Sequence, residues 1–278
     1  MGFLWLNSVN KLSVQLKNYK INKKYIDKNR YSRPGSKLYK VNAIVIHWVA
    51  NAKTTAKNNR DYFNNLPSIN ANNNKKGLKS TYGSAHEVIG LDGEIVLCIP
   101  DNETAYHVGS KTYTNKAKKL IASYPNRYSY GIECCHPDWI GKFNNKTYTT
   151  LINRVADLCI KFNLKPSENT IWRHYDVVGW KDCPRYYVKN PKEWDQLIKD
   201  VQDIYNKKIN KKTDEVIKLA LQQWQKDMGE QALKSLNKKK DNKGQLIVDK
   251  PENWKKSLSE NTPQWLFWSI VDRVTNTK

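Results

Sequence analysis

Residues 42–50 read NAIVIHWVA, an apolar run of strand length that is rich in β-branched residues. Such a run predicts a buried central strand. One polar side chain, His47, lies inside it. A buried imidazole without a partner costs about 1–3 kcal/mol. His47 therefore needs a hydrogen-bonding partner or a metal ion, and a satisfied structural histidine is the commoner explanation for such a residue alone.

Helices and strands alternate around this stretch. Helices are predicted over 54–66 (ended by Pro67), 148–162 and 191–205. Further strands are predicted over 129–135, over 171–174 and within 85–100, where Asp92-Gly93 indicates a hairpin turn. The composition of 70–80 and of the stretch after His174 is that of loops. The alternation predicts an α/β fold with a mixed β-sheet flanked by helices.

The character of the sequence changes near residue 207. The stretch KKINKK at 207–212 is predicted to be a short basic linker, and the remainder has helical periodicity without a strand run. We therefore expect one domain over 1–206 and a small all-α module over 207–278. The apolar residues available to that module's core are Trp224, Leu233, Leu236, Trp254, Leu258, Trp265, Phe267 and Trp268.

The chain of 278 residues has a formal net charge of +22. A basic chain attracts polyanions such as nucleic acids, anionic membranes or anionic wall polymers. The lysines are dispersed, however, as they also are in proteins from A/T-rich genomes, and no nucleic-acid-binding motif is present. No apolar stretch is long enough to span a membrane, and the N-terminal apolar run is too short for a signal peptide. Five cysteines without a regular spacing indicate reduced thiols and synthesis in the cytoplasm.

A second group of metal-ligand residues lies near the end of the first domain. RHYDVVGWKDCP at 173–184 places His174, Lys181 and Cys183 within ten residues. Imidazole and thiolate are good zinc ligands, and three protein ligands plus water form the usual catalytic zinc site. The spacing alone is weak evidence, because a free core cysteine would also explain Cys183, and Asp182 is an alternative third ligand.

Five motifs in order resemble one known family. VIHWVA (45–50), SAHEVIGLDG (84–93), TAYHVG (104–109), YGIE (130–133) and RHYDVVGWKDCP are similar to those of the zinc-dependent N-acetylmuramoyl-L-alanine amidases. That family includes phage amidase endolysins and peptidoglycan-recognition proteins. The resemblance covers about residues 30–200 and implies the family's mixed sheet with flanking helices.

The resemblance also implies roles for particular residues. His47, His174 and Cys183 match the ligands of a Zn²⁺ ion, and Glu133 and Lys181 match catalytic residues. Some members use a tyrosine just before the hairpin, where this chain has Ala85. His107 matches a histidine near the substrate cleft and is therefore expected to bind substrate. Asp176 is a candidate for orienting the ligands, although a capping role explains it equally well.

The implied reaction is hydrolysis of the amide between N-acetylmuramic acid and L-alanine in peptidoglycan, as in an endolysin that lyses the cell wall. We expect the enzyme to reach the wall through a membrane pore and the 207–278 module to bind an anionic wall polymer. Two alternatives are a non-catalytic peptidoglycan-binding protein of the same fold and a basic nucleic-acid-binding protein.

Overall fold

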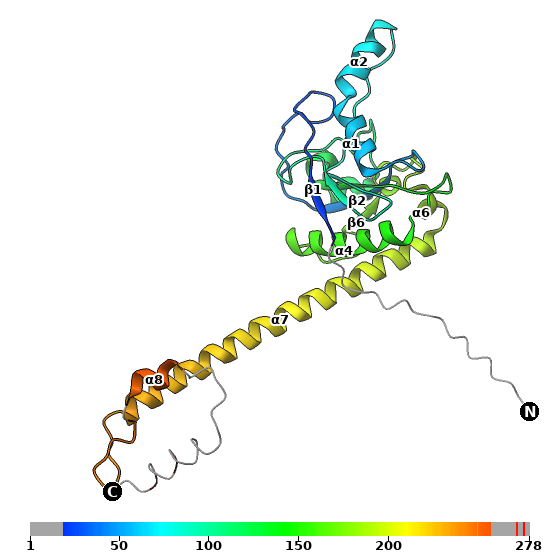
Figure 1. Cartoon of the computed structure of the whole chain (residues 1–278). Helices are drawn as coiled ribbons and strands as arrows, with labels where there is room; N and C mark the ends of the chain where they lie inside the picture. Colours follow the sequence, from blue (N-terminus) through cyan, green and yellow to red (C-terminus); the bar gives the residue numbers. More distant parts are fainter. Residues whose placement is uncertain (1–18, 249, 257–270, 272–274, 276–278) are drawn as a thin grey trace, which may run out of the picture. The chain divides into compact units, whose positions relative to one another are not determined.

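A computed structural model describes residues 19–248, 250–256, 271 and 275 (Figure 1). Its centre is a six-stranded sheet in the order β1-β4-β3-β5-β2-β6, in which β3 and β4 form an antiparallel hairpin and the other pairs are parallel. The predicted mixed sheet is therefore confirmed. Its strands are β1 (Ile21–Lys23), β2 (Ala43–Trp48), β3 (Glu87–Ile89), β4 (Ile95–Leu97), β5 (Ser129–Cys134) and β6 (Ile171–Arg173).

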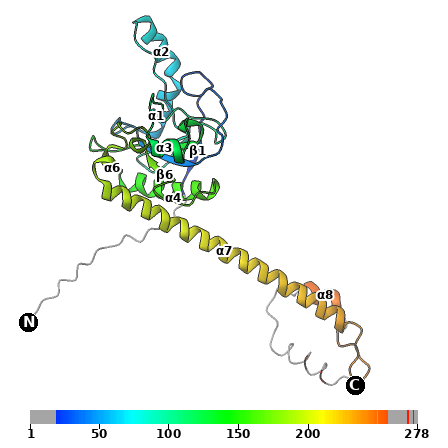
Figure 2. The same cartoon turned by 180° about the vertical axis from the view of Figure 1, so that it is seen from behind.

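Helices lie on both faces of this sheet (Figures 1 and 2). Their bounds are α1 (Ala56–Asn64), α2 (Leu66–Lys75), α3 (Asn115–Leu120), the short 3₁₀ helix η1 (Pro125–Arg127), α4 (Asn145–Lys161), α5 (His174–Val178), α6 (Arg185–Lys189), α7 (Pro191–Leu236) and α8 (Pro251–Lys256). Thr55 and Asn144 cap α1 and α4 by accepting hydrogen bonds from backbone N–H groups of the first turn.

Strand β2 is buried along its whole length, and its side chains alternate between two apolar clusters. Ile44, Ile46 and Trp48 belong to the cluster that includes residues of α4 and the start of α7. Ala43 and Val45 belong to the cluster that includes residues of α3 and α5. Because successive side chains of a strand point to opposite faces, His47 shares the second face with Ala43 and Val45.

Four local predictions are wrong. Pro67 lies in the first turn of α2, so it begins a helix, and part of the predicted loop at 70–80 is helical as far as Lys75. The stretch after His174 contains the two short helices α5 and α6. The predicted linker at 207–212 lies within α7, which is continuous from Pro191 to Leu236.

The chain divides into two compact units, Met1–Lys208 and Ile209–Lys278. Within the second unit, the described residues are helical as far as Leu236 and again in α8. Four of the apolar residues expected to form its core, Leu258, Trp265, Phe267 and Trp268, lie outside the described residues. Among the residues that the structure describes, no helix is both long and apolar enough to cross a membrane.

Candidate metal centre and active site

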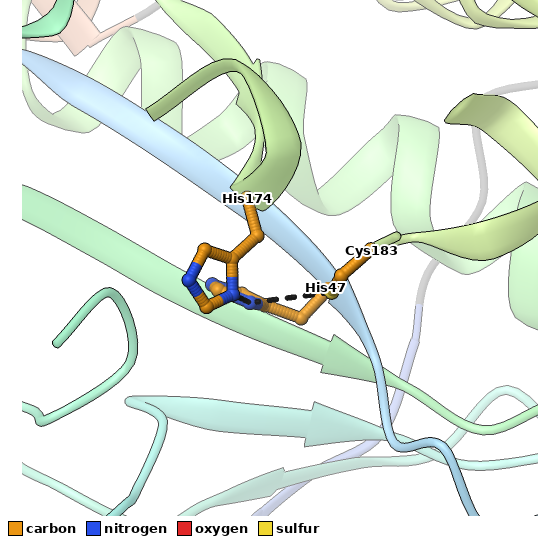
Figure 3. Close-up of side chains that lie close together, drawn as sticks. All are labelled: His47, His174 and Cys183. Carbon is orange, nitrogen blue, oxygen red and sulfur yellow. Dashed lines mark hydrogen bonds between the residues drawn. The ribbon is translucent and has the colours of Figure 1, made fainter. Parts of the chain in front are cut away.

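Three buried side chains from separate segments meet near the carboxyl end of β2 (Figure 3). His47 lies on β2, and His174 is the first residue of α5, directly after β6. The register that pairs Ile46 with Arg173 places His174 beside His47. Cys183 lies between α5 and α6, where its carbonyl accepts a hydrogen bond from the Tyr175 N–H. The pairing of β2 with β6, together with the segment that follows α5, therefore brings together residues that are up to 136 positions apart.

The potential ligand atoms of this cluster are close enough to share one ion. The Nδ1 atoms of His47 and His174 are 3.0 Å apart, and the Cys183 Sγ lies 3.7 Å from the His47 Nδ1. All three ligand atoms lie within 4.8 Å of one another. A tetrahedral zinc ion with ordinary bond lengths separates two nitrogens by ~3.3 Å and a nitrogen from a sulfur by ~3.6 Å. The donor set and its spacing therefore fit a metal ion of this type.

A chain of hydrogen bonds fixes which nitrogen of His47 faces the cluster. The His107 Nε2 lies 3.3 Å from the Ser129 carbonyl, which can only accept, so this nitrogen carries the hydrogen. The His107 Nδ1 is then an acceptor, and the His47 Nε2 donates to it over 3.0 Å. The His47 Nδ1 consequently keeps a free lone pair directed at His174 and Cys183.

Alternate residues of β5 lie beside His107 and His47. Ser129 holds the His107 ring, and Gly131 makes room for it, since a Cβ at that position would lie 2.4 Å from the His107 Cγ. Glu133 is next on the same face and is the register partner of His47 on β2. The glycine of the YGIE motif is therefore explained by the close packing of His107.

Glu133 and Lys181 line one pocket of about 400 Å³ together with His107 and His174. Burial raises the pKa of Glu133 to about 8, against the opposing effect of Lys181. The Glu133 Oε2 has no hydrogen-bond partner among the described residues. A carboxyl group with a pKa near neutrality and a free oxygen can both accept and donate a proton near pH 7.

Burial also sets the protonation states of the ligand cluster. It lowers the pKa of His47 well below the ordinary value, with a further contribution from His174, and lowers that of His174 to about 2. Both imidazoles are therefore neutral at pH 7, as metal ligation requires. Burial raises the pKa of Cys183, and the nearby Glu133 adds to this effect. A cation is thus needed to make Cys183 a thiolate at neutral pH.

Other residues singled out from the sequence lie away from the ligand atoms. Asp182 pairs with Arg185 at 3.3 Å, whereas Cys183 is the member of the cluster. Asp176 forms a two-bond ion pair with Arg173. The His86 ring accepts from the Gly131 N–H at Nδ1 and donates from Nε2 to the Glu103 carbonyl, which indicates a structural role.

The pocket also contains residues that sequence reasoning missed. Ala85, at the place of the family's tyrosine, is fully buried, but the aromatic rings of Phe63, Tyr82 and Tyr106 line the same pocket as Glu133. Tyr106 directly precedes His107 in the TAYHVG motif, and this position is the sequence feature that could have identified it as a residue of the site. The expected substrate contact of His107 remains a prediction, since this ring is 6% exposed and bonds to His47 and Ser129.

The fold and this cluster together define a class: an α/β protein with a His-His-Cys metal-type site at the end of a central parallel strand pair, beside a carboxyl group and a lysine. The N-acetylmuramoyl-L-alanine amidase family matches residues 37–186, more than half of the chain. The chain belongs to this family, and the matched range contains every residue of the cluster.

Individual relatives agree with this assignment. The chain is 32% identical over 194 residues to the N-acetylmuramoyl-L-alanine amidase CwlL of Bacillus licheniformis, covering 70% of this chain and 50% of that protein. It is 33% identical over 176 residues to BlyA of Bacillus subtilis (strain 168), covering 61% and 43%. The chain thus spans about half the length of these curated relatives. The Staphylococcus aureus hydrolase AmiA shares the fold, with a TM-score of 0.50 and 19% identity over 70% of this chain and 88% of that one.

Proposed function

We propose that this chain is a zinc-dependent amidase that hydrolyses the bond between N-acetylmuramic acid and L-alanine in bacterial peptidoglycan. Membership of the amidase family supports the substrate. The observation that carries the proposal is the convergence of three buried ligand atoms beside the free oxygen of Glu133. His47, His174 and Cys183 would hold the Zn²⁺ ion.

Each residue of the site has a part in this reaction. When bound, zinc polarises the amide carbonyl and lowers the pKa of a water molecule toward ~7. Glu133 takes a proton from the attacking water and gives it to the leaving amine, in keeping with its raised pKa of about 8. Lys181 stabilises the negative charge that develops on the carbonyl oxygen. His107 holds His47 in the tautomer that presents Nδ1 to the ion.

Mass analysis of digested peptidoglycan tests this proposal. The expected products carry new L-alanine amino termini, without new reducing sugar ends. A non-catalytic binder of the same fold would be retained on peptidoglycan and release nothing. Bound zinc without any product would therefore contradict the proposed reaction and favour the binding alternative.

We further propose that residues 1–206 form the catalytic domain and that residues 207–278 form a helical module that binds an anionic wall polymer. The division at Lys208 and the exposed apolar side chains of Leu219, Trp224 and Met228 on α7 support a separate binding surface. A chain ending at Lys208 should cleave soluble muropeptides like the full chain but act more slowly on intact cells.

A control separates binding from nonspecific attraction. The difference on cells should persist at about 0.3 M salt, where the Debye length is below ~8 Å. If the shortened chain matches the full chain on cells, the module does not target the wall.

A further inference from the structure

The loop that follows β5 presents two large apolar side chains to solvent. Trp139 and Ile140 are 60% and 65% exposed, although they are neighbours in sequence. Adjacent exposed apolar groups of this size mark an interaction site more often than a single one does. The loop lies between Cys134, the last residue of β5, and α4.

This loop is held in place by several specific contacts. The Asp138 Oδ1 accepts from the Ile140 N–H at 2.9 Å, and the Trp139 carbonyl accepts from the Arg185 guanidinium at 3.1 Å. Gly141 has a φ of +82°, and a Cβ there would lie 2.7 Å from the Trp48 ring. Trp139 is therefore displayed on a preorganised loop, which reduces the entropy lost on binding.

The loop forms one side of a surface hollow of about 480 Å³ whose other residues come from α6 and its C-terminal end. The hollow is lined by Trp139, Ile140, Arg185, Tyr186, Lys189 and Asn190. The hollow includes residues that are close in the chain to the metal centre. Arg185 follows Cys183 by two residues, and its guanidinium lies 4.7 Å from the ring of Trp48, the residue after His47.

The charges of the hollow indicate what kind of ligand it suits. Arg185 and Lys189 share the carboxylate of Asp182, at 3.3 and 3.9 Å. Nearby, Lys142 pairs with Glu193 at 3.8 Å. With these cations already paired, an acidic peptide gains little here. An uncharged ligand with flat apolar faces and polar edges is better matched to an exposed indole, a phenol and an amide.

We propose that this hollow, with Trp139 as its stacking platform, binds the amino-sugar strand of peptidoglycan next to the residue whose amide is cleaved. This inference rests on the proposed function, since it extends the substrate beyond the pocket of Glu133. The Trp139 ring covers the apolar face of a sugar, and Asn190 supplies hydrogen bonds to its polar edge. This hollow and the pocket lined by Glu133 and Lys181 have no lining residue in common among the described residues.

The test compares two substrates with the zinc-loaded full chain. One is a single N-acetylmuramoyl group carrying L-alanyl-D-isoglutamine, and the other is a solubilised glycan strand of several disaccharides bearing the same peptide. The readout is kcat/KM for release of L-alanine amino termini. The variants are Trp139→Ala, Trp139→Phe and, as a control at an exposed aromatic residue outside the hollow, Tyr124→Ala, which is 73% exposed in the wild type.

Wild-type kcat/KM should be higher on the strand, and Trp139→Ala should lower the strand value by about three- to tenfold, mainly through KM. Trp139→Phe should recover most of this loss, and Tyr124→Ala should behave as wild type. The single-sugar value should stay unchanged in every variant.

Two results would overturn the proposed sugar-binding role of Trp139. They are no preference of the wild type for the strand, or an equal loss of kcat/KM on both substrates in Trp139→Ala. If the wild type releases no amino termini from either substrate, the proposed function itself fails, which is a separate outcome.

Discussion

Two buried polar clusters lie on strands of the same sheet, one around Glu87 on β3 and one around His47 on β2, with β5 between them. They differ in how completely their atoms are paired. Around Glu87 on β3, both carboxylate oxygens accept from the Arg154 guanidinium, at 2.7–3.1 Å, and one also accepts from the Tyr130 hydroxyl. Around His47, in contrast, two further buried atoms, the Glu133 Oε2 and the His174 Nε2, have no partner among the described residues.

The difference indicates which cluster is structural and which is chemical. Buried polar groups are normally paired, and a complete network like that of Glu87 stabilises one packing of the core. Unpaired buried polar atoms cost free energy unless an ion or a substrate satisfies them, and Glu133 and His174 line the same pocket. Strand β3 pairs with β5, so that Glu87 lies opposite Ile132 and Val88 lies opposite Glu133. The structural carboxylate and the proposed catalytic carboxylate are therefore only one register position apart.

The largest effect is expected from Cys183→Ser. A hydroxyl is a poor zinc ligand compared with a thiolate, so the variant should lose bound zinc and turnover should fall to background. Zinc content after dialysis and release of L-alanine amino termini measure this. Cys159→Ala is the matched control, since Cys159 is also buried but lies in the apolar core. Retention of full zinc by Cys183→Ser would remove this residue from the metal centre.

Glu133→Gln should keep the fold and the zinc but lower kcat by about 10²–10⁴-fold, because an amide cannot carry the proton between water and the leaving amine. Kinetics on a soluble muropeptide measure the loss. Tyr106→Phe is the companion variant, since Tyr106 lines the same pocket. Activity of Glu133→Gln within a few-fold of wild type, together with a large loss in Tyr106→Phe, would transfer the proton-transfer role to the tyrosine.

The paired cluster should respond in the opposite way. Glu87→Ala leaves the Arg154 charge buried without its partner and should lower the free energy of unfolding by about 3–5 kcal/mol. Urea unfolding measures this, while turnover per folded molecule and zinc content should stay near wild type. The double variant Glu87→Leu/Arg154→Leu should recover much of the stability. A folded Glu87→Ala protein without activity would contradict the distinction between the two clusters.

The sequence predicts the local parts of this molecule well. The apolar run at 42–50, the Asp92-Gly93 turn and the helical spacing at 148–162 each correspond to an observed element, because each is determined by residues close together in the chain. The proposed ligands were found from motif order. That His47 and His174 are adjacent follows from strand pairing, which the motifs alone do not contain.

The failures have physical causes as well. Helix α7 passes through 207–212 because Lys is a good helix former and no Pro or Gly occurs between Pro191 and Gly229. Pro67 can begin α2 because the first helical turn needs no backbone N–H from it. The bond from His107 to His47 joins residues 60 positions apart, and it depends on the space that Gly131 leaves, which no local pattern encodes.

That bond gives the next prediction. His107→Ala removes the acceptor of the His47 N–H, so His47 is free to adopt the other tautomer. Zinc affinity should fall by about 10–100-fold, as is typical for a residue that orients a ligand. Competition with a chelator measures the affinity. His107→Gln retains an acceptor and should recover part of the loss. A normal affinity in His107→Ala, with a raised KM alone, would favour the substrate-binding role.

The smallest effect concerns pH and a histidine that is fully paired. Burial lowers the pKa of His86 from 6.5 to about 3, so the folded protein holds this ring neutral while the unfolded chain gains a proton below pH 6.5. The contribution of His86 to stability is therefore lost as the pH falls from 6.5 toward 3, by about 1.4 kcal/mol per pH unit. Urea unfolding between about pH 7.5 and pH 5 should show this slope reduced in His86→Gln by that amount. Because the ring is paired with Gly131 and Glu103 outside the ligand cluster, zinc binding at pH 7.5 should be unchanged in the variant. An unchanged slope would contradict the lowered pKa of His86, and a loss of zinc would place His86 with the metal-binding cluster.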